Sequence, residues 1–172
     1  MKTKNLTIAA VLLALGSILH MIVPGIINGM KPDFLLLMMF ISILFNLEIR
    51  SVFTIGFVAG IIAAMTTTFP FGQIPSILDK LGSSLLVYVM FNLALKKYKI
   101  NNIIMFIICF LGSIFSGFIF LYSALIISGL PEGATLSLLM ILVVFPTSLF
   151  TGVFGIIFYN IMNFTNKKHL MV

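Results

Sequence analysis

Residues 100–131 read INNIIMFIICFLGSIFSGFIFLYSALIISGLP, a run without a single charged side chain. A charged side chain is costly in hydrocarbon, and a spanning helix needs about 20 apolar residues, so this run predicts one membrane-spanning helix. The other uncharged stretches cover 5–30, 34–47, 51–78, 81–95 and 133–166. Together the six stretches predict an all-α integral membrane protein with helices near 6–27, 32–47, 51–68, 76–95, 102–128 and 134–162.

The composition of the whole chain agrees with a protein solvated by lipid. Of its 172 residues, 61% are hydrophobic and 8% are charged, whereas soluble domains have roughly 25% charged residues. We therefore expect residues 1–172 to form a single transmembrane domain in the lipid bilayer. The formal charge of +6 does not predict nucleic-acid binding, because no basic patch is interleaved with aromatic residues on a soluble segment.

Two of the uncharged stretches, the second along the chain (34–47) and the fourth (81–95), are too short to span a membrane by themselves. The second becomes long enough if its helix begins at Pro32, since proline is favourable in a first helical turn. The fourth becomes long enough if its helix starts near Ser76, where Ser76-x-x-Asp79 resembles a capping box. Both extensions place charged residues, Asp33, Asp79 and Lys80, in the first turn of a membrane helix.

The distribution of Lys and Arg predicts the orientation, because cytoplasmic loops carry an excess of these residues. With six helices, the side that holds the termini carries Lys2, Lys4, Arg50, Lys96, Lys97, Lys99, Lys167 and Lys168. The opposite side carries only Lys31 and Lys80. The pattern predicts that the N- and C-termini are both cytoplasmic.

Nothing in the sequence indicates an enzyme. There is no G-x-x-x-x-G-K-[ST] phosphate loop, and His20 and His169 are too far apart to predict a metal site. The four acids of the chain form no cluster of the kind that catalysis needs. We therefore predict no catalytic residue, no metal and no cofactor. His20 is either a proton relay or a hydrogen-bond partner of a neighbouring helix.

Two charged turns on the outer side predict a binding site. Lys31-Pro32-Asp33 opens the second helix and Asp79-Lys80 opens the fourth. A helix N-terminus and a Lys side chain suit a substrate carboxylate, and an aspartate suits an ammonium group. The two turns could therefore hold a zwitterion, or they could only mark where the helices leave the membrane.

Polar and aromatic residues near the second of these turns extend the predicted site. Gln73 can donate and accept hydrogen bonds, and Phe69 or Phe71 could stack on an aromatic ligand. Tyr122 is a further polar group at membrane depth. An interfacial aromatic belt explains the aromatic residues equally well.

Small residues spaced by four mark two helix faces that allow close approach in lipid. Ala10-x-x-x-Ala14 lies on the first helix and Gly56-x-x-x-Gly60 on the third. Each stripe either packs inside the bundle or docks a partner. Pro146 predicts a kink in the sixth helix.

Four segments resemble the tryptophan transporter TrpP family: MKTKNLTIAA at the start, GMKPDFLLLMMF, FPFGQIPSILDK, and the SGLP turn after the fifth helix. Members of this family are similar to the substrate-binding S components of energy-coupling factor (ECF) transporters. The resemblance implies an S-component-like bundle of six helices in a bacterial plasma membrane. It also implies that Ala10 and Ala14 dock on a transmembrane T component, which works with two ATPase subunits.

Three functions follow as alternatives. The first is an S component that captures L-tryptophan outside the cell, with ATP hydrolysed on other chains. The second is a stand-alone proton-coupled transporter, which could form a homodimer through Gly56 and Gly60. The third is a membrane subunit that packs against or regulates others without transporting anything. In the first, Lys80 or Lys31 holds the substrate carboxylate, and Asp33 or Asp79 holds its ammonium.

Overall fold

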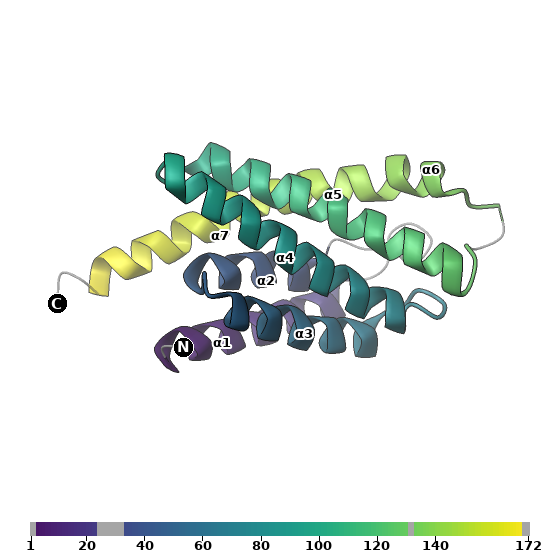
Figure 1. Cartoon of the computed structure of the whole chain (residues 1–172), viewed down its shortest axis with the longest axis horizontal. Coiled ribbons are helices and arrows are strands. Elements are labelled where there is room, and N and C mark those ends of the chain that lie inside the picture. The colour runs from purple at the N-terminus through teal and green to yellow at the C-terminus, as the bar shows by residue number, and fades with distance from the viewer. Residues whose placement is uncertain (1–2, 24–32, 131–132, 170–172) are drawn as a thin grey trace.

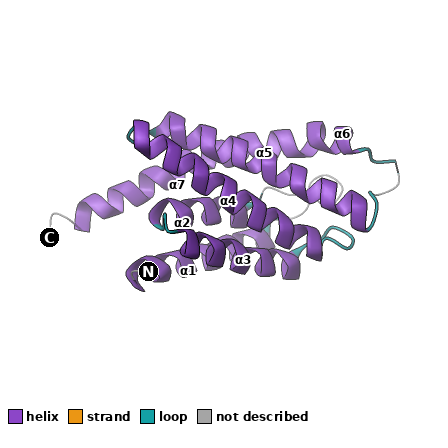
Figure 2. Cartoon of the chain, in the orientation of Figure 1, coloured by secondary structure: helices purple, strands orange, loops and turns teal. Residues whose placement is uncertain are grey.

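The computed structural model describes residues 3–23, 33–130 and 133–169, and every regular element among them is helical (Figure 2). The elements in chain order are α1 (Thr3–Ile22), α2 (Phe34–Phe45), α3 (Ile49–Thr66), α4 (Gln73–Lys97), α5 (Asn102–Ile127), α6 (Leu136–Leu139), the π-helical turn η1 (Met140–Val144) and α7 (Phe145–His169). Because α6, η1 and α7 follow one another without a break, the described chain forms six helical rods. The six predicted helices are therefore confirmed.

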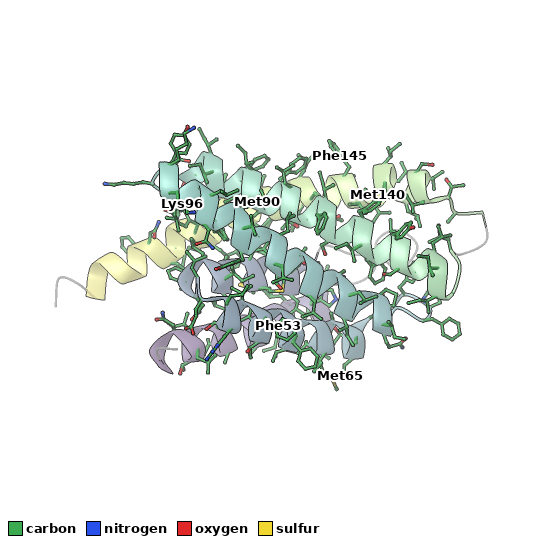
Figure 3. The ribbon with its side chains drawn as sticks, viewed as in Figure 1. Phe53, Met65, Met90, Lys96, Met140 and Phe145 are labelled. Carbon is green, nitrogen blue, oxygen red and sulfur yellow. The ribbon has the colours of Figure 1, made fainter. Side chains whose placement is uncertain are left out.

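Five of the rods are long and apolar enough to cross a membrane. Their outer surface is apolar along its length: Phe53, Met65 and Phe145, labelled in Figure 3, are 54%, 81% and 51% exposed. Exposed side chains of this kind are stable in contact with lipid rather than water. The protein is accordingly an integral membrane helical bundle.

The sixth rod, α2, lies at the centre of the bundle. Its residues from Leu35 to Ile43 are all buried, and it contacts α1, α3, α4, α5 and α7. Twelve residues make a helix only about 18 Å long, well short of the roughly 30 Å hydrocarbon layer. It can be short because neighbouring helices, rather than lipid, surround it.

The two ends of α2 are held by side chains. At the N-terminus, Asp33 is the N-cap, and its Oδ1 accepts a hydrogen bond of 2.9 Å from the backbone N–H of Leu36. At the other end, Asn46 Nδ2 donates to the carbonyl of Asn5 at 3.1 Å, and Asn5 Nδ2 donates to the carbonyl of Phe45 at 3.1 Å. This reciprocal pair fixes the end of α2 to the start of α1. The predicted start at Pro32 is wrong, because the chain enters the helix only after the Asp33 cap.

The predicted start of α4 at Ser76 is also wrong. The helix begins at Gln73, with Gly72 as an N-cap that makes no side-chain capping bond. Pro75 is tolerated in this first turn because the first N–H groups of a helix have no intrahelical partner. Asp79 and Lys80 therefore lie in the second turn, inside the helix, and Ser76 does not form a capping box.

The glycine stripe of α3 packs against α4. A Cβ atom on Gly56 would collide with the Ser84 side chain, and one on Gly60 would lie 3.1 Å from the Cα of Ile77. Both glycines are buried, so the hypothesis of a homodimer through this stripe is wrong. Ala10 and Ala14, by contrast, are exposed on α1.

The start of α1 and the end of α7 lie at one end of the bundle, together with the connections α2–α3 and α4–α5 (Figure 1). The connections α3–α4 and α5–α6 lie at the opposite end. Arg50, Lys96, Lys97 and Lys99 belong to the first end, where Figure 3 labels Lys96. The even number of rods and the basic character of one end agree with the charge pattern of the sequence.

Candidate functional site

A buried cluster of charged side chains joins α2 and α4. Lys80 Nζ lies 2.7 Å from Asp33 Oδ2 and 2.9 Å from Asp79 Oδ1. The side chains of Lys80, Asp79 and Asp33 are 3%, 4% and 23% exposed. Burying charges is costly unless they are paired and hydrogen-bonded, and here one ammonium group pairs with two carboxylates.

Two further helices complete the cluster. From α5, Ser116 Oγ donates a hydrogen bond of 2.8 Å to Asp79 Oδ1. From α1, His20 Nδ1 lies 3.2 Å from Asp33 Oδ1. Four helices, α1, α2, α4 and α5, thus each contribute a polar side chain to one point inside the bundle. Ionisable groups in such a position inside a membrane bundle indicate function by default.

The sequence places Asp79 and Lys80 inside because α4 carries its polar face inward. The polar side chains of α4 that are buried recur at helical spacing: Ser76, Asp79, Lys80, Ser83 and Ser84. The Ser83 hydroxyl donates to the Asp79 carbonyl at 2.7 Å, and the Ser84 hydroxyl donates to the Leu81 carbonyl at 2.9 Å. This spacing of i, i+3, i+4, i+7 and i+8 is visible in the sequence and predicts an inward-facing polar stripe.

The cluster borders a cavity that is lined by residues of all six rods and of the α3–α4 connection. Its polar lining consists of His20, Asp33, Thr67, Thr68, Ser76, Asp79, Lys80, Ser113, Ser116 and Thr147. Its apolar lining consists of Leu36, Ala63, Phe69, Gly117, Phe120 and Val144. The rings of Phe69 and Phe120 meet edge to face with their centroids 5.3 Å apart. One cavity therefore offers both signs of charge, several hydroxyl groups and an aromatic pair.

Four of the predicted binding residues lie together at this cavity, Asp33, Phe69, Asp79 and Lys80, and His20 lines it as well. Other residues that line the cavity were not predicted from the sequence, among them Ser116, Gly117, Phe120, Val144 and Thr147. In α5, a stripe of small and polar residues, Ser113, Ser116 and Gly117, could have indicated the site. In an otherwise apolar helix, the same stripe also fits packing against a neighbouring helix.

Three other predicted binding residues, Phe71, Gln73 and Tyr122, do not line the cavity. Phe71 is 73% exposed in a left-handed turn (φ 54°), and Gln73 is exposed at the start of α4. Tyr122 is 51% exposed and stacks on Phe118 with ring centroids 5.8 Å apart, on the outside of α5. Lys31 lies outside the described residues.

Across the described part of the chain, no group of three or more His, Cys, Asp or Glu residues is arranged to hold a metal ion. The ammonium group and the two carboxylates of the cluster are complementary in charge to the carboxylate and the ammonium of a zwitterion. The adjoining aromatic pair can hold a flat apolar group.

Several known proteins are similar to this chain in sequence. The family model described as "Tryptophan transporter TrpP" matches residues 2–167. A "Probable tryptophan transport protein" of Bacillus subtilis (strain 168) is 44% identical over 162 residues, which cover 94% of this chain and 92% of the relative. A protein of the same description from Clostridium acetobutylicum is 44% identical over 162 residues, covering 92% of this chain and 91% of the relative. A third, from Clostridium perfringens, is 41% identical over 168 residues, covering 93% and 91%. No solved structure matches the chain.

Proposed function

The chain belongs to the tryptophan transporter TrpP family, and on that premise we propose that it is a membrane-embedded substrate-binding (S) component. In this function its single six-helix domain captures L-tryptophan outside a bacterial cell for import. The energy comes from a separate T component and two ATPase subunits. The relatives are named as transport proteins, and the chain has no phosphate loop, which suits a division of labour with ATPase chains.

The observation that carries the proposal is the paired charge cluster beside an aromatic cavity. Lys80 contacts two carboxylates, those of Asp33 and Asp79. A zwitterion can enter such a cluster by exchanging partners: its carboxylate takes the place of one aspartate at Lys80, and that aspartate takes the substrate ammonium. The exchange leaves the net charge of the buried site unchanged, so it avoids the cost of burying an unpaired charge.

The same geometry provides for the indole ring. Phe69 and Phe120 line the cavity, and Ser116 of α5 ties the charged end to the helix that carries Phe120. An indole extending from the charged cluster would pack against these rings over a large apolar area.

The proposed orientation puts the cavity on the outer side of the plasma membrane. The basic residues of the described loops lie at the end that holds the termini, and such an excess is typical of the cytoplasmic side. Asp33, Asp79 and Lys80 lie toward the α3–α4 end, since α4 begins there and the N-terminus of the short α2 is directed toward it. A cavity at that end receives substrate from outside the cell.

Docking on a T component is proposed for the exposed stripe of Ala10 and Ala14. Both residues face away from the bundle core, whereas their neighbours Ala9, Leu12 and Leu13 are buried. Small side chains let the backbone of a partner helix approach closely in lipid, where van der Waals packing drives association.

The contact between His20 Nδ1 and Asp33 Oδ1, at 3.2 Å, favours one alternative. A titratable pair beside the binding cluster suits a stand-alone transporter that couples tryptophan uptake to protons. Such a transporter would have to work without a dimer interface at Gly56 and Gly60, because α4 covers both glycines.

Uptake of radiolabelled tryptophan separates the two functions. Liposomes containing only this chain should not accumulate tryptophan under an imposed proton gradient, because the energising subunits are absent. Cells that express the chain with its T component and ATPases should accumulate it, and substitution of the phosphate-loop lysine in the ATPases should stop uptake. Accumulation in the liposomes that an uncoupler abolishes would refute the S-component function and support the proton-coupled one.

A further inference from the structure

We propose that Gly117 of α5 and Val144 of the π-helical turn form the wall that sets the size limit for the indole ring. The inference rests on the proposed function, since it names the residues that select among ligands in the same cavity. Both residues line that cavity.

The two residues are in close contact. A Cβ atom placed on Gly117 would lie 2.5 Å from Val144 Cγ1 and 2.8 Å from Val144 Cγ2. Real side-chain contacts are not this short, so α5 and the last rod can approach this closely only with glycine at position 117. Any larger residue there would push Val144 away from α5.

The backbone holds Val144 in place. It is the last residue of the π-helical turn, whose limits are marked by Met140 and the following Phe145 in Figure 3. The Val144 carbonyl accepts hydrogen bonds from Ser148 Oγ at 2.6 Å and from Thr147 Oγ1 at 3.0 Å. A β-branched side chain in a helix has one strongly preferred rotamer. Val144 is thus a fixed wall, and single π turns of this kind recur at functional sites.

The wall is only one side chain thick. Val144 also lines a second hollow, with Ile114, Met140, Ile141 and Phe145. Ile141 and Phe145 are 68% and 51% exposed, so this hollow opens toward lipid. Removing the two methyl groups of Val144 would join the hollow to the cavity and give room for a substituent on the ring.

The charged cluster directs the ring toward this wall. Ser116 donates to Asp79, and Gly117 is the next residue of α5. Phe120 lies one turn further along the same helix and meets Phe69. A ligand held by its amino-acid end at Asp79 therefore places its ring between the aromatic pair and Val144.

Binding of ring-substituted ligands to the purified, detergent-solubilised protein tests the wall. The wild-type chain should bind tryptophan and reject 4-, 5-, 6- and 7-methyltryptophan. The variant Val144→Ala should accept at least one of the four, with a preference ratio changed by about tenfold or more relative to the wild type. One extra methyl group in an apolar pocket changes affinity by roughly 10- to 200-fold.

A second pair of variants tests the contact itself. Gly117→Ala should weaken tryptophan binding by about tenfold or more, and Val144→Ala in the same chain should restore most of the loss by removing the collision. Gly82→Ala is the matched control, because its Cβ would collide only with the flexible end of Ile119, at Cδ1, and Gly82 does not line the cavity. It should bind tryptophan as the wild type does.

Each outcome has one meaning. If the wild type binds tryptophan while a folded Val144→Ala variant keeps the wild-type preference, the wall is not formed by Val144. If Gly117→Ala binds normally, or if its defect is not relieved by Val144→Ala, the contact does not control the site. If the wild type itself binds no tryptophan, the proposed function fails, and this inference fails with it.

Discussion

Lys80 contacts both carboxylates of the charge cluster at distances below 3 Å while its own side chain is 3% exposed. In such surroundings a side chain cannot exchange its partner for water without a large cost in free energy. Lys80 can, however, exchange one of its carboxylate partners for another anion of similar geometry. This property suits a site for a zwitterion and makes the cluster the first target for substitution.

Asp79→Asn should weaken tryptophan binding by roughly 2 kcal/mol or more, because it removes one desolvated charge that a substrate ammonium can use. The variant keeps the size of the side chain and a group that can accept from Ser116, and Lys80 keeps Asp33. It should therefore remain folded. Titration of the purified variant with tryptophan measures the loss. Affinity equal to the wild type would exclude Asp79 from the site.

Lys80→Ala should weaken binding by a similar amount and also lower the thermal unfolding midpoint, since Asp33 and Asp79 would be left buried without a cation. Asp33→Asn and Asp79→Asn combined with Lys80→Met remove all three charges and should restore stability without restoring binding. Binding recovered along with stability would show that the cluster only holds the helices together.

The sequence predicted the charged residues of the site but placed Asp79 and Lys80 incorrectly. The two residues were expected in the first turn of a helix, whereas they lie in the second turn on an inward polar stripe. No pattern in the sequence predicts the approach of Gly117 to Val144, because it depends on how α5 packs on a π-helical turn. Pro146 has no backbone N–H and therefore indicates an irregularity in the helix, but it does not specify where the π-helical turn lies.

Among the elements, α1 has the exposed small-residue face that the proposed partner needs. Ala10→Phe should prevent assembly with the T component while leaving tryptophan binding intact, because the large ring blocks close approach of a helix without entering the core. Co-purification with the other subunits measures assembly. Phenylalanine is preferred to tryptophan for this variant, because it adds no indole fluorescence.

The control for this variant is Leu15→Phe, which changes a residue of α1 that is 48% exposed and lies about 100° or more around the helix from both Ala10 and Ala14. It should assemble normally. Assembly of Ala10→Phe at the wild-type level would exclude this stripe as the docking face, and loss of tryptophan binding would show that the stripe packs within the bundle.

Helix number and approximate helix limits could be predicted from the uncharged stretches, because the lipid penalises charge wherever a rod is exposed to it. The same reasoning was wrong for α2. It assumes that each helix must cross the membrane by itself, whereas α2 is enclosed by other helices and capped by Asp33 and the Asn5–Asn46 pair. Enclosure is a property of the assembled bundle, so the length of one segment does not reveal it.

At the scale of the whole molecule, the two ends of the bundle should face opposite sides of the membrane. The chain has one cysteine, Cys109, and it is buried, so single introduced cysteines can be labelled with little background. In intact cells, Phe71→Cys should react with a membrane-impermeant maleimide, whereas Tyr98→Cys should react only after permeabilisation. Phe71 and Tyr98 are 73% and 59% exposed at opposite ends of α4. The reverse pattern of labelling would invert the proposed topology.

Tryptophan binding by the isolated chain is the most direct test of a site built from the Asp33–Lys80–Asp79 cluster and its aromatic cavity. The protein contains no tryptophan of its own, so excitation at the red edge of the indole band reports the ligand almost alone. Titration of the purified, detergent-solubilised protein should give a saturable shift in ligand emission that non-fluorescent analogues compete away and leucine does not. A folded protein that produces no such shift would contradict tryptophan capture by this chain.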